Sequence, residues 1–372
     1  MERERGEGPN RWDVMQKMDK NVRNLRLQSL VGRELKNRWE RFGFSPEWSF
    51  RIVPIAEEGE NAEKYTVTFY SEGRKAEKRL FLKRYLHPQI DRVAVENEFQ
   101  GLRLTHEAFK ETARFRVPQP YGRLLDEKII FMEYYPSVSF KRVLFRPLRL
   151  SRFFLSGEER ESLSRKVAAA GRMLALFQQI PVSVHPTDEE ETAEGIVLRY
   201  EKQSLSRLRA CHEAGLPEAL LRKIQKYLLG RLQAKGNATP KVLQHSDFAP
   251  WNLMVSREEL CLTDFQNFTV GFPYFDAAFF YASLDLLFRY KTVDRSFLSH
   301  LQALFLESFL DASAGGIPKE ESLHFFKVFR LMHMVYFSQS MLRSDRPFYE
   351  PAYAVSCRRF IIDWFNQNLE DE

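Results

Sequence analysis

The chain has 372 residues, which is enough for two or three domains with sizeable cores. Its 44% hydrophobic and 28% charged residues describe an ordinary globular protein, and its net charge of +6 permits an anionic partner without indicating nucleic acid. The three cysteines, Cys211, Cys261 and Cys357, lie far apart and lack ligand-like spacing with histidine, which argues against a disulfide framework or a structural metal site. The charged first ten residues predict no signal peptide, so we expect a cytoplasmic protein.

Residues 1–46 are predicted to form an N-terminal extension. Residues 1–12 are charged and poor in apolar side chains, a composition that predicts disorder. Over residues 13–42, apolar side chains recur at helical spacing with basic side chains between them, which predicts a basic amphipathic helix. Such a helix either packs on its own protein, which is the commoner outcome, or binds a membrane surface or another partner.

Residues 47–136 are predicted to form a small sheet-rich lobe. Alternation of apolar and polar side chains predicts strands over 50–55, 65–70 and 79–85, and a last strand within 128–136. One helix is expected between the third and the last of these strands. Its buried face is predicted from side chains at helical spacing: Val95, Phe99, Leu102, His106 and Phe109. We interpret His106 as a packing residue of that face.

Residues 137–372 are predicted to be mainly helical. The predicted helices cover residues 158–180, 193–214, 217–234, 293–309, 319–341 and 352–368. The longest apolar run, residues 275–288, contains Asp276 and Asp285 and is too short to span a bilayer. We therefore expect it to form a buried helix.

Residues 139–154 carry basic side chains among Phe and Leu residues, and Pro147 argues against one uninterrupted helix there. The basic residues are Lys141, Arg142, Arg146, Arg149 and Arg152. The segment is either a solvated face whose arginine stems lie over apolar surface, or a dock for an anionic acceptor or phospholipid headgroups.

The stretch from Lys241 to Asp276 has the clearest chemical pattern. Two short apolar runs, around residues 253–255 and 260–263, flank a turn and predict a hairpin. The hairpin brings Asn252 and Asp264 together, with Asp247 at the mouth of the same loop. Asp264 and Asn252 supply the hard oxygen ligands that Mg²⁺ prefers, and Asp247 is placed to accept the proton of an attacking hydroxyl. This trio indicates phosphoryl transfer.

The spaced set His245-Ser246-Asp247, Asn252 and Asp264-Phe265 resembles the catalytic loop and metal-binding aspartate of the protein-kinase-like superfamily. Pro250 inside the loop and Gly271-x-Pro273-x-x-Asp276 after it are similar to the aminoglycoside phosphotransferase and choline kinase branch. The resemblance implies an α+β, bilobal protein-kinase-like fold. Its N-lobe, residues 47–136, would hold a small antiparallel sheet with one main helix, and its larger helical C-lobe would cover residues 137–372.

The resemblance also implies roles for individual residues, with ATP and Mg²⁺ as cofactors. Catalysis would rest on Asp247, Asn252 and Asp264, with Asn252 and Asp264 as metal ligands. Lys83 would hold the nucleotide phosphates and pair with Glu98, for which Glu96 is the rival. The adenine hinge would be Met132, Glu133, Tyr134 and Tyr135. His245 and Asp276 would be structural supports of the loop.

The acceptor is predicted to be a hydroxyl of a small molecule, such as a sugar, an aminoglycoside or an amino alcohol. About sixty residues separate the helix predicted over 158–180 from the catalytic loop, where the similar branch inserts acceptor-site helices. Only eleven residues separate Asp264 from Asp276, which leaves no room for a segment that binds peptide substrates.

Two departures from the family pattern keep alternatives open. The loop over residues 56–64 has one glycine and four glutamates, although phosphate-binding loops favour glycine. Gln266 stands where the branch usually has an acid. One alternative, which these departures leave open, is an inactive nucleotide-binding pseudokinase scaffold. The other, which the basic segments suggest, is a membrane-surface kinase of a glycolipid or anionic acceptor. The latter would sit peripherally at the inner membrane surface through the basic segments 13–42 and 139–154.

Overall fold

The computed structural model describes residues 27–34, 49–55, 62–71, 74–88, 90–184, 192–235, 240–313, 319–342 and 351–369. By compactness the chain divides into two units. The first comprises Met1–Ile90 and Pro120–Tyr134, and the second Asp91–Gln119 and Tyr135–Glu372. The predicted disordered start, both ends of the predicted N-terminal helix and most of the glutamate-rich loop lie outside the described residues.

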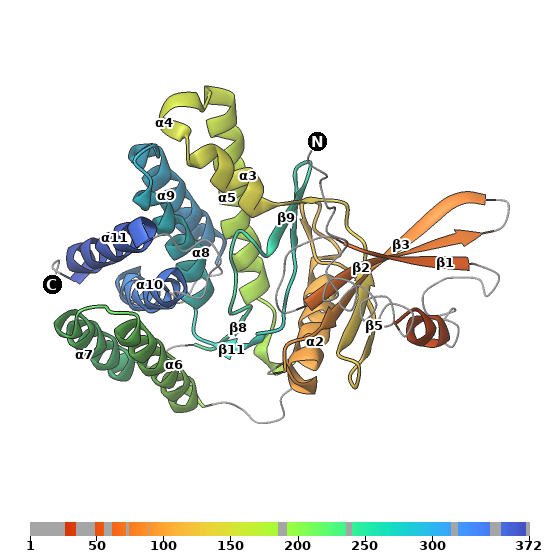
Figure 1. Ribbon diagram of the computed structural model, residues 1–372, viewed down its shortest axis with the longest axis horizontal. Coiled ribbons are helices and arrows are strands. Elements are labelled where there is room, and N and C mark those ends of the chain that lie inside the picture. Colours follow the sequence, from red (N-terminus) through yellow and green to blue (C-terminus); the bar gives the residue numbers. More distant parts are fainter. Residues whose placement is uncertain are drawn as a thin grey trace, which may run out of the picture. The chain divides into compact units, whose positions relative to one another are not determined.

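The first unit contains an antiparallel sheet with the strand order β1-β2-β3-β6-β5 (Figure 1). Its strands are β1 (Ser49–Pro54), β2 (Ala62–Ser71), β3 (Arg74–Tyr85), β5 (Pro120–Leu124) and β6 (Ile129–Glu133). The four predicted strands are thus confirmed, and β5 is an additional one. Alternate residues such as Tyr65, Val67 and Phe69 are buried, because successive side chains of a strand point to opposite faces.

A helix over residues 27–34 packs its apolar side chains into the core of this sheet. Leu27 is 3% exposed and Val31 is fully buried, in one cluster with Ile52 and Val67. The described part of the predicted basic helix therefore packs on its own protein. Its two buried apolar side chains are not available to a membrane.

The second unit is mainly helical, and its helices match the predicted ones to within a few residues. The helices are α2 (Arg92–Phe109), α3 (Phe140–Leu148), α4 (Ser151–Phe154), α5 (Gly157–Gln178), α6 (Ala193–Glu213), α7 (Glu218–Lys235), α8 (Phe275–Asp285), α9 (Arg295–Ala312), α10 (Lys319–Leu342) and α11 (Pro351–Leu369), with 3₁₀ turns at Val182–Val184 and Leu286–Arg289. Compactness assigns α2 to this unit, although the sequence placed it in the lobe over 47–136. The domain boundaries stay a prediction.

Short strands of the second unit carry the loop predicted to be catalytic. A four-stranded sheet has the order β4 (Phe115–Arg116), β10 (Glu259–Leu262), β9 (Leu253–Ser256) and β7 (Val138–Ser139). β9 and β10 pair as the predicted antiparallel hairpin, with Leu260 opposite Val255. β8 (Val242–Gln244) pairs antiparallel with β11 (Thr269–Gly271). A β-carbon at Gly271 would lie 2.2 Å from the side chain of buried Gln244. Glycine at position 271 therefore leaves the space that the Gln244 side chain occupies.

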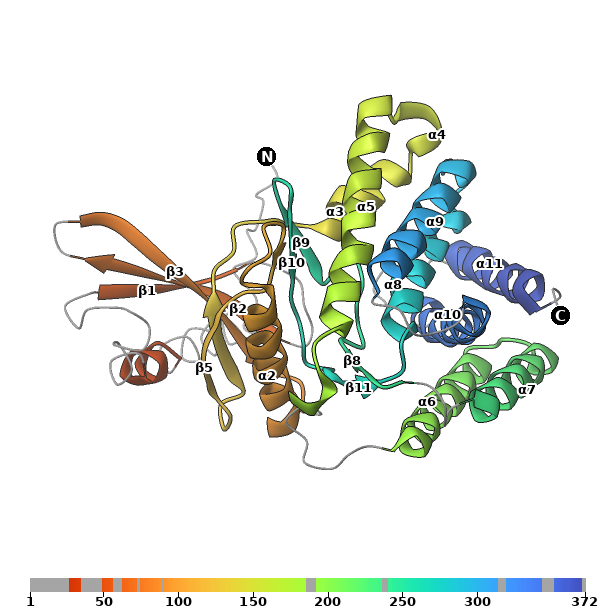
Figure 2. The ribbon, with the colours of Figure 1, turned by 180° about the vertical axis from the view of Figure 1, so that it is seen from behind.

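Aromatic side chains and close helix contacts fill the core around these strands. Phe280 stacks on Phe305 with ring centroids 4.2 Å apart, and Phe177 packs against Phe265 at 6.1 Å. Helices α5 and α9 run side by side (Figure 2), and a β-carbon at Gly171 would lie 2.4 Å from the carbonyl oxygen of Phe305. The apolar run forms α8 and a 3₁₀ turn, which confirms the predicted buried helix. Among the described helices, none is long and apolar enough to cross a membrane.

Candidate functional site

The β9–β10 hairpin brings together the ends of the loop that carry the predicted catalytic residues. The backbone N–H and the hydroxyl of Thr263 both donate to the carbonyl oxygen of Asn252, at 3.0 and 3.1 Å. Asp264 follows directly and has φ 70°, and Ser246 on the other side of the loop has φ 64°. Non-glycine residues rarely adopt this left-handed conformation, and such residues concentrate at functional sites. The surrounding structure, and not the intrinsic preference of these two residues, therefore holds their backbone in the left-handed conformation.

Asp247 is a partly buried carboxylate whose two oxygens both accept hydrogen bonds. The indole Nε1–H of Trp251 donates to Oδ1 at 3.2 Å, and Asn252 Nδ2 donates to Oδ2 at 2.8 Å. Burial first, and then the charge of Asp264, raise the pKa of Asp247 to about 7, while the two hydrogen bonds lower it. A carboxylate poised near neutral pH suits general-base chemistry.

The side-chain amide of Asn252 is oriented by its contacts with Asp247. Its Nδ2 donates to both the backbone oxygen and Oδ2 of Asp247, at 2.9 and 2.8 Å, so its Oδ1 is left to act as a ligand. One amide oxygen and the nearby carboxylate of Asp264 fit Mg²⁺, which usually takes one or two protein ligands and keeps waters and phosphates. No set of three or more His, Cys, Asp or Glu side chains in the described part of the chain is placed to bind a metal.

Asp276, in the first turn of α8, holds the start of the same loop. Its Oδ2 accepts the backbone N–H of His245 and its Oδ1 that of Ser246, both at 2.8 Å. The carboxylate is fully buried, and burial raises its pKa to about 7 against the lowering effect of these hydrogen bonds. This geometry supports the predicted bracing role.

His245 bridges the loop and the second strand of the hairpin. Its Nε2–H donates to the carbonyl oxygen of Thr263 at 2.9 Å, and its ring packs against Phe265 at 4.7 Å. The side chain is fully buried. These contacts support the expectation that His245 is a structural support of the site.

The predicted nucleotide residues lie in both units. Lys83 on β3 is 6% exposed, with its Nζ 4.6 Å from the ring centroid of Tyr85. Glu98 on α2 is 1% exposed, whereas its rival Glu96 is partly buried and accepts a hydrogen bond from Gln100. Charged side chains are rarely fully buried unless they are paired, so burial favours Glu98 over Glu96 as the predicted partner of Lys83. The pairing of Lys83 with Glu98 stays a prediction.

The predicted hinge spans the end of β6 and the start of the second unit. Met132 is buried and, with Glu133, belongs to β6, while the guanidinium carbon of Arg79 lies 5.8 Å from the centre of the Tyr134 ring. The hydroxyl of Tyr135 donates to Oε2 of Glu259 at 2.7 Å, which anchors this residue to the hairpin. The structure thus gives Tyr135 a contact that the sequence did not suggest.

Two further residues near Asp247 were missed by the sequence reasoning. Trp251 donates a hydrogen bond to Asp247. Burial first, and then the charge of Asp247, raise the pKa of the Tyr336 phenol on α10. Trp251 stands inside the motif between Pro250 and Asn252, so its position was a usable signal. Tyr336 comes from a distant helix whose sequence carries no such mark.

Comparisons with known proteins identify a matching family and several similar structures. A family model described as "Phosphotransferase enzyme family" matches residues 52–317. A choline/ethanolamine kinase family protein from Mesorhizobium loti has a similar structure, with a TM-score of 0.52, 15% identity, and coverage of 86% of this chain and 91% of that chain. A glucosamine kinase in complex with glucosamine, ADP and inorganic phosphate has a TM-score of 0.52, 16% identity, and coverage of 87% and 83%. No curated protein matches the sequence. At these identities the similar structures establish a kinase-like fold.

Proposed function

The chain belongs to the phosphotransferase enzyme family, and from this premise we propose that it moves the γ-phosphoryl group of ATP, bound with Mg²⁺, to a hydroxyl of a small molecule. The single observation that carries this proposal is that Asp247, Asn252 and Asp264 lie close together at one end of the hairpin. A sugar, an aminoglycoside or an amino alcohol is the acceptor class we would test first. We place the activity in the cytoplasm.

Each residue of the loop has a distinct task in this proposal. Asp247 accepts the proton of the acceptor hydroxyl, and its hydrogen bonds from Trp251 and Asn252 fix its orientation. Asn252 Oδ1 and the Asp264 carboxylate would hold Mg²⁺, which when bound neutralises charge on the phosphates. Asp276 and His245 keep the loop in its left-handed conformation at Ser246.

The nucleotide-binding residues of the proposal come from the family resemblance. Lys83 would contact the phosphates with Glu98 as its partner, and Met132 to Tyr135 would contact the adenine. The buried positions of Lys83 and Glu98 support this assignment, because charged side chains are rarely buried without a role.

Changing Asp264 to alanine is expected to weaken the binding of ATP in the presence of Mg²⁺ by about tenfold or more, because it removes the carboxylate of the proposed metal pair. Isothermal titration calorimetry with ATP, in Mg²⁺ and in EDTA, measures this effect. Glu258→Ala is the matched control, because Glu258 is an exposed carboxylate at the turn of the same hairpin. Equal Mg²⁺-dependent affinity in the wild type and Asp264→Ala would contradict the ligand role.

The reaction itself is tested by screening hydroxyl compounds for acceptor-stimulated ADP release. Sugars, aminoglycosides and amino alcohols form the panel, and glucosamine is a natural first member because a glucosamine kinase shares the fold. ADP release that depends on both acceptor and Mg²⁺ supports the proposal. Thermal stabilisation by Mg²⁺ and ATP without any ATP consumption would instead support an inactive nucleotide-binding scaffold.

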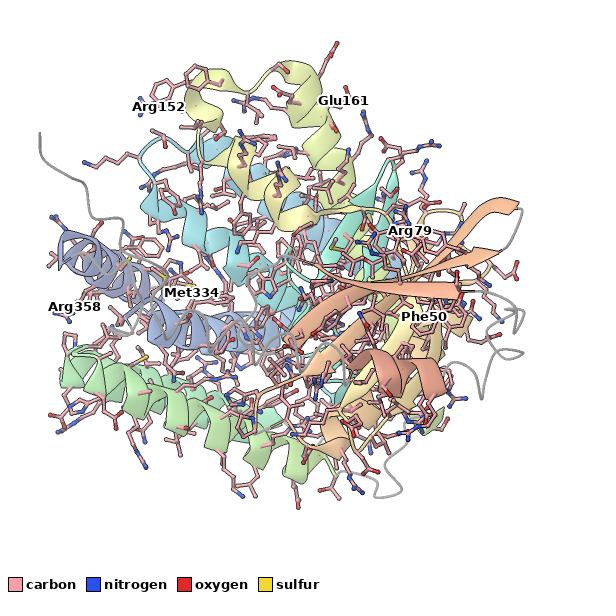
Figure 3. All side chains as sticks on the ribbon, turned by 45° about the vertical axis from the view of Figure 1, so that its right-hand side comes forward. Phe50, Arg79, Arg152, Glu161, Met334 and Arg358 are labelled. Atoms are coloured by element: carbon pink, nitrogen blue, oxygen red, sulfur yellow. The ribbon has the colours of Figure 1, made fainter. Side chains whose placement is uncertain are left out.

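A second candidate function, contact with an anionic membrane surface, is favoured by exposed aromatic residues on α4. Phe153 is 61% exposed, Phe154 76% and Leu150 48%, and exposed Arg146, Arg149 and Arg152 lie in the same segment. Figure 3 labels Arg152, one of these exposed residues. Large apolar side chains beside basic ones are the pattern of proteins that bind anionic lipid surfaces.

Hydrogen bonds to residues 292 and 294 hold the backbone of α4, which carries the exposed side chains. The backbone N–H of Arg152 donates to the carbonyl oxygen of Thr292 at 3.1 Å, and the hydroxyl of Ser151 accepts the N–H of Asp294 at 2.8 Å. Arg160 also pairs with Asp294, at 2.9 Å. As predicted, no single uninterrupted helix covers residues 139–154, because α3 ends at Leu148, one residue after Pro147, and α4 begins at Ser151.

The double variant Phe153→Ser/Phe154→Ser is expected to lower binding to vesicles containing phosphatidylglycerol by about tenfold or more, because two apolar anchors are lost. Co-sedimentation at low and high salt measures this, and salt should weaken the wild type because the arginines contribute. Leu198→Ser/Val355→Ser, which alters exposed apolar residues on α6 and α11, is the control. Binding that is the same in all three proteins, or equal on uncharged vesicles, would refute a membrane role for α4.

A further inference from the structure

Arg207 on α6 is a charged side chain whose hydrogen bonds are incomplete. Its Nη1 is buried and has no hydrogen-bond partner within the described part of the chain, and no carboxylate there forms an ion pair with it. Its guanidinium carbon lies 4.7 Å from the centre of the Tyr336 ring. A buried donor without an acceptor is destabilising, so other contacts must hold Arg207 in this position.

The Arg207–Tyr336 pair lies beside the proposed proton acceptor. Tyr336 packs against Phe337 and Phe279, with ring centroids 5.5 and 5.9 Å apart. Both phenylalanines pack against the indole of Trp251, at 6.0 and 5.8 Å. Trp251 in turn donates to Asp247. A continuous group of rings therefore joins Arg207 to the carboxylate that would take the hydroxyl proton.

The contact with Arg207 changes what this aromatic group can bind. Aromatic faces near a phosphotransfer site suit a cationic acceptor, because a cation is attracted to the ring quadrupole. Here the guanidinium of Arg207 already lies over the Tyr336 ring and would repel a second cation. Arg207 as a whole is only partly buried and Tyr336 is 36% exposed, so the pair lies at the surface of the second unit. A guanidinium matches carboxylates and phosphates better than any other group.

We propose that Arg207 and Tyr336 form a subsite that binds a carboxylate or phosphate group of the acceptor, so that the preferred acceptor is an anionic hydroxyl compound. This inference rests on the proposed phosphotransferase function and narrows its substrate class. Neither the family match nor the similar structures supply it, since it depends on the position of one arginine. The subsite orients the acceptor, and Asp247 remains the group that takes its proton.

Binding of four sugars that share one pyranose ring tests the proposal. Isothermal titration calorimetry with the full chain and Mg·ADP compares glucose 6-phosphate, glucuronate, glucose and glucosamine. We expect at least one of the two anionic sugars to bind about tenfold or more tightly than glucose, and glucosamine to bind most weakly. The comparison of glucose 6-phosphate with glucuronate shows whether phosphate or carboxylate is preferred.

Variants of α6 show whether Arg207 causes the preference. Arg207→Gln should lower the affinity for the anionic sugar about tenfold or more and leave that for glucose nearly unchanged, while Arg207→Lys should retain part of the preference. Arg209→Gln, an exposed arginine two residues along, should change neither affinity. A purely structural arginine would shift all affinities together with the unfolding temperature, which is measured for each variant.

Equal affinity for charged and uncharged sugars, tightest binding of glucosamine, or no binding of any of the four overturns the proposal. The same holds if Arg207→Gln keeps the preference for the anion. Failure of the phosphotransferase function would look different. In that case the anionic sugar binds through Arg207 but no acceptor stimulates ADP release from ATP.

Discussion

Replacing Asp247 by asparagine is expected to lower kcat by about 10²–10⁴-fold while sparing nucleotide binding, because an amide cannot accept a proton from the attacking hydroxyl. Asparagine also offers one acceptor oxygen where Asp247 uses two, so it loses the contact with either Trp251 or Asn252. Steady-state ADP release with a stimulating acceptor measures kcat, and calorimetry with ATP measures nucleotide affinity. Turnover within about tenfold of the wild type would mean that Asp247 is not the base.

Trp251→Phe separates the charge of Asp247 from its orientation. It keeps the carboxylate and the ring but removes the indole donor, so we expect a smaller loss of kcat than in Asp247→Asn. That hydrogen bond lowers the pKa of Asp247, and its removal should therefore raise this pKa.

The pH dependence supplies an independent signature of the same residue. The pKa of Asp247 is raised to about 7 by burial and by the charge of Asp264, and only the ionised carboxylate accepts a proton. The value of kcat/KM should therefore rise with pH through about 7 and level off above it, and in Trp251→Phe this rise should move to higher pH. An unchanged profile in Trp251→Phe would argue against Asp247 as the titrating group.

Much of the fold could be predicted because the decisive patterns are local. The alternation over β2 and β3 and the helical spacing over α5 and α6 each fit inside one element, which is how hydrophobic periodicity acts. The grouping of the three predicted site residues could be predicted for the same reason. Asp247 and Asn252 are five residues apart, and one tight hairpin returns the chain to Asp264.

The contacts that join distant elements could not be predicted. Tyr135 and Glu259 are 124 residues apart, and no local pattern pairs them. The position of Arg207 over Tyr336 depends on how α6 packs against α10, and the periodicity of either helix shows only that it has an apolar face. Gly271 was recognised as a motif residue. The physical reason for a glycine there is the close approach of the Gln244 side chain, which depends on the register of β8 and β11.

Replacing Asp276 by alanine is expected to destabilise the second unit by about 2–6 kcal/mol and to abolish turnover, because one buried and one partly buried backbone N–H group lose their acceptor. The loss also frees Ser246 from its left-handed conformation, which disorganises the loop that carries Asp247. Chemical denaturation measures the stability, and hydrogen exchange of the amides of His245 and Ser246 measures the local effect. Asp91→Ala is the control, since exposed Asp91 also accepts a backbone N–H, that of Ala94, at the start of α2.

The pH dependence of this effect has a definite sign. Burial raises the pKa of Asp276 from its usual 3.8 to about 7, so between these values the folded protein holds a proton that the unfolded chain releases. The stability contribution of the proton is complete below about pH 4 and is lost as pH rises through about 7. The stability difference between the wild type and Asp276→Ala should therefore shrink as pH rises over this range. A difference that is constant with pH, together with slow exchange at His245 and Ser246 in the variant, would show that other groups hold the loop.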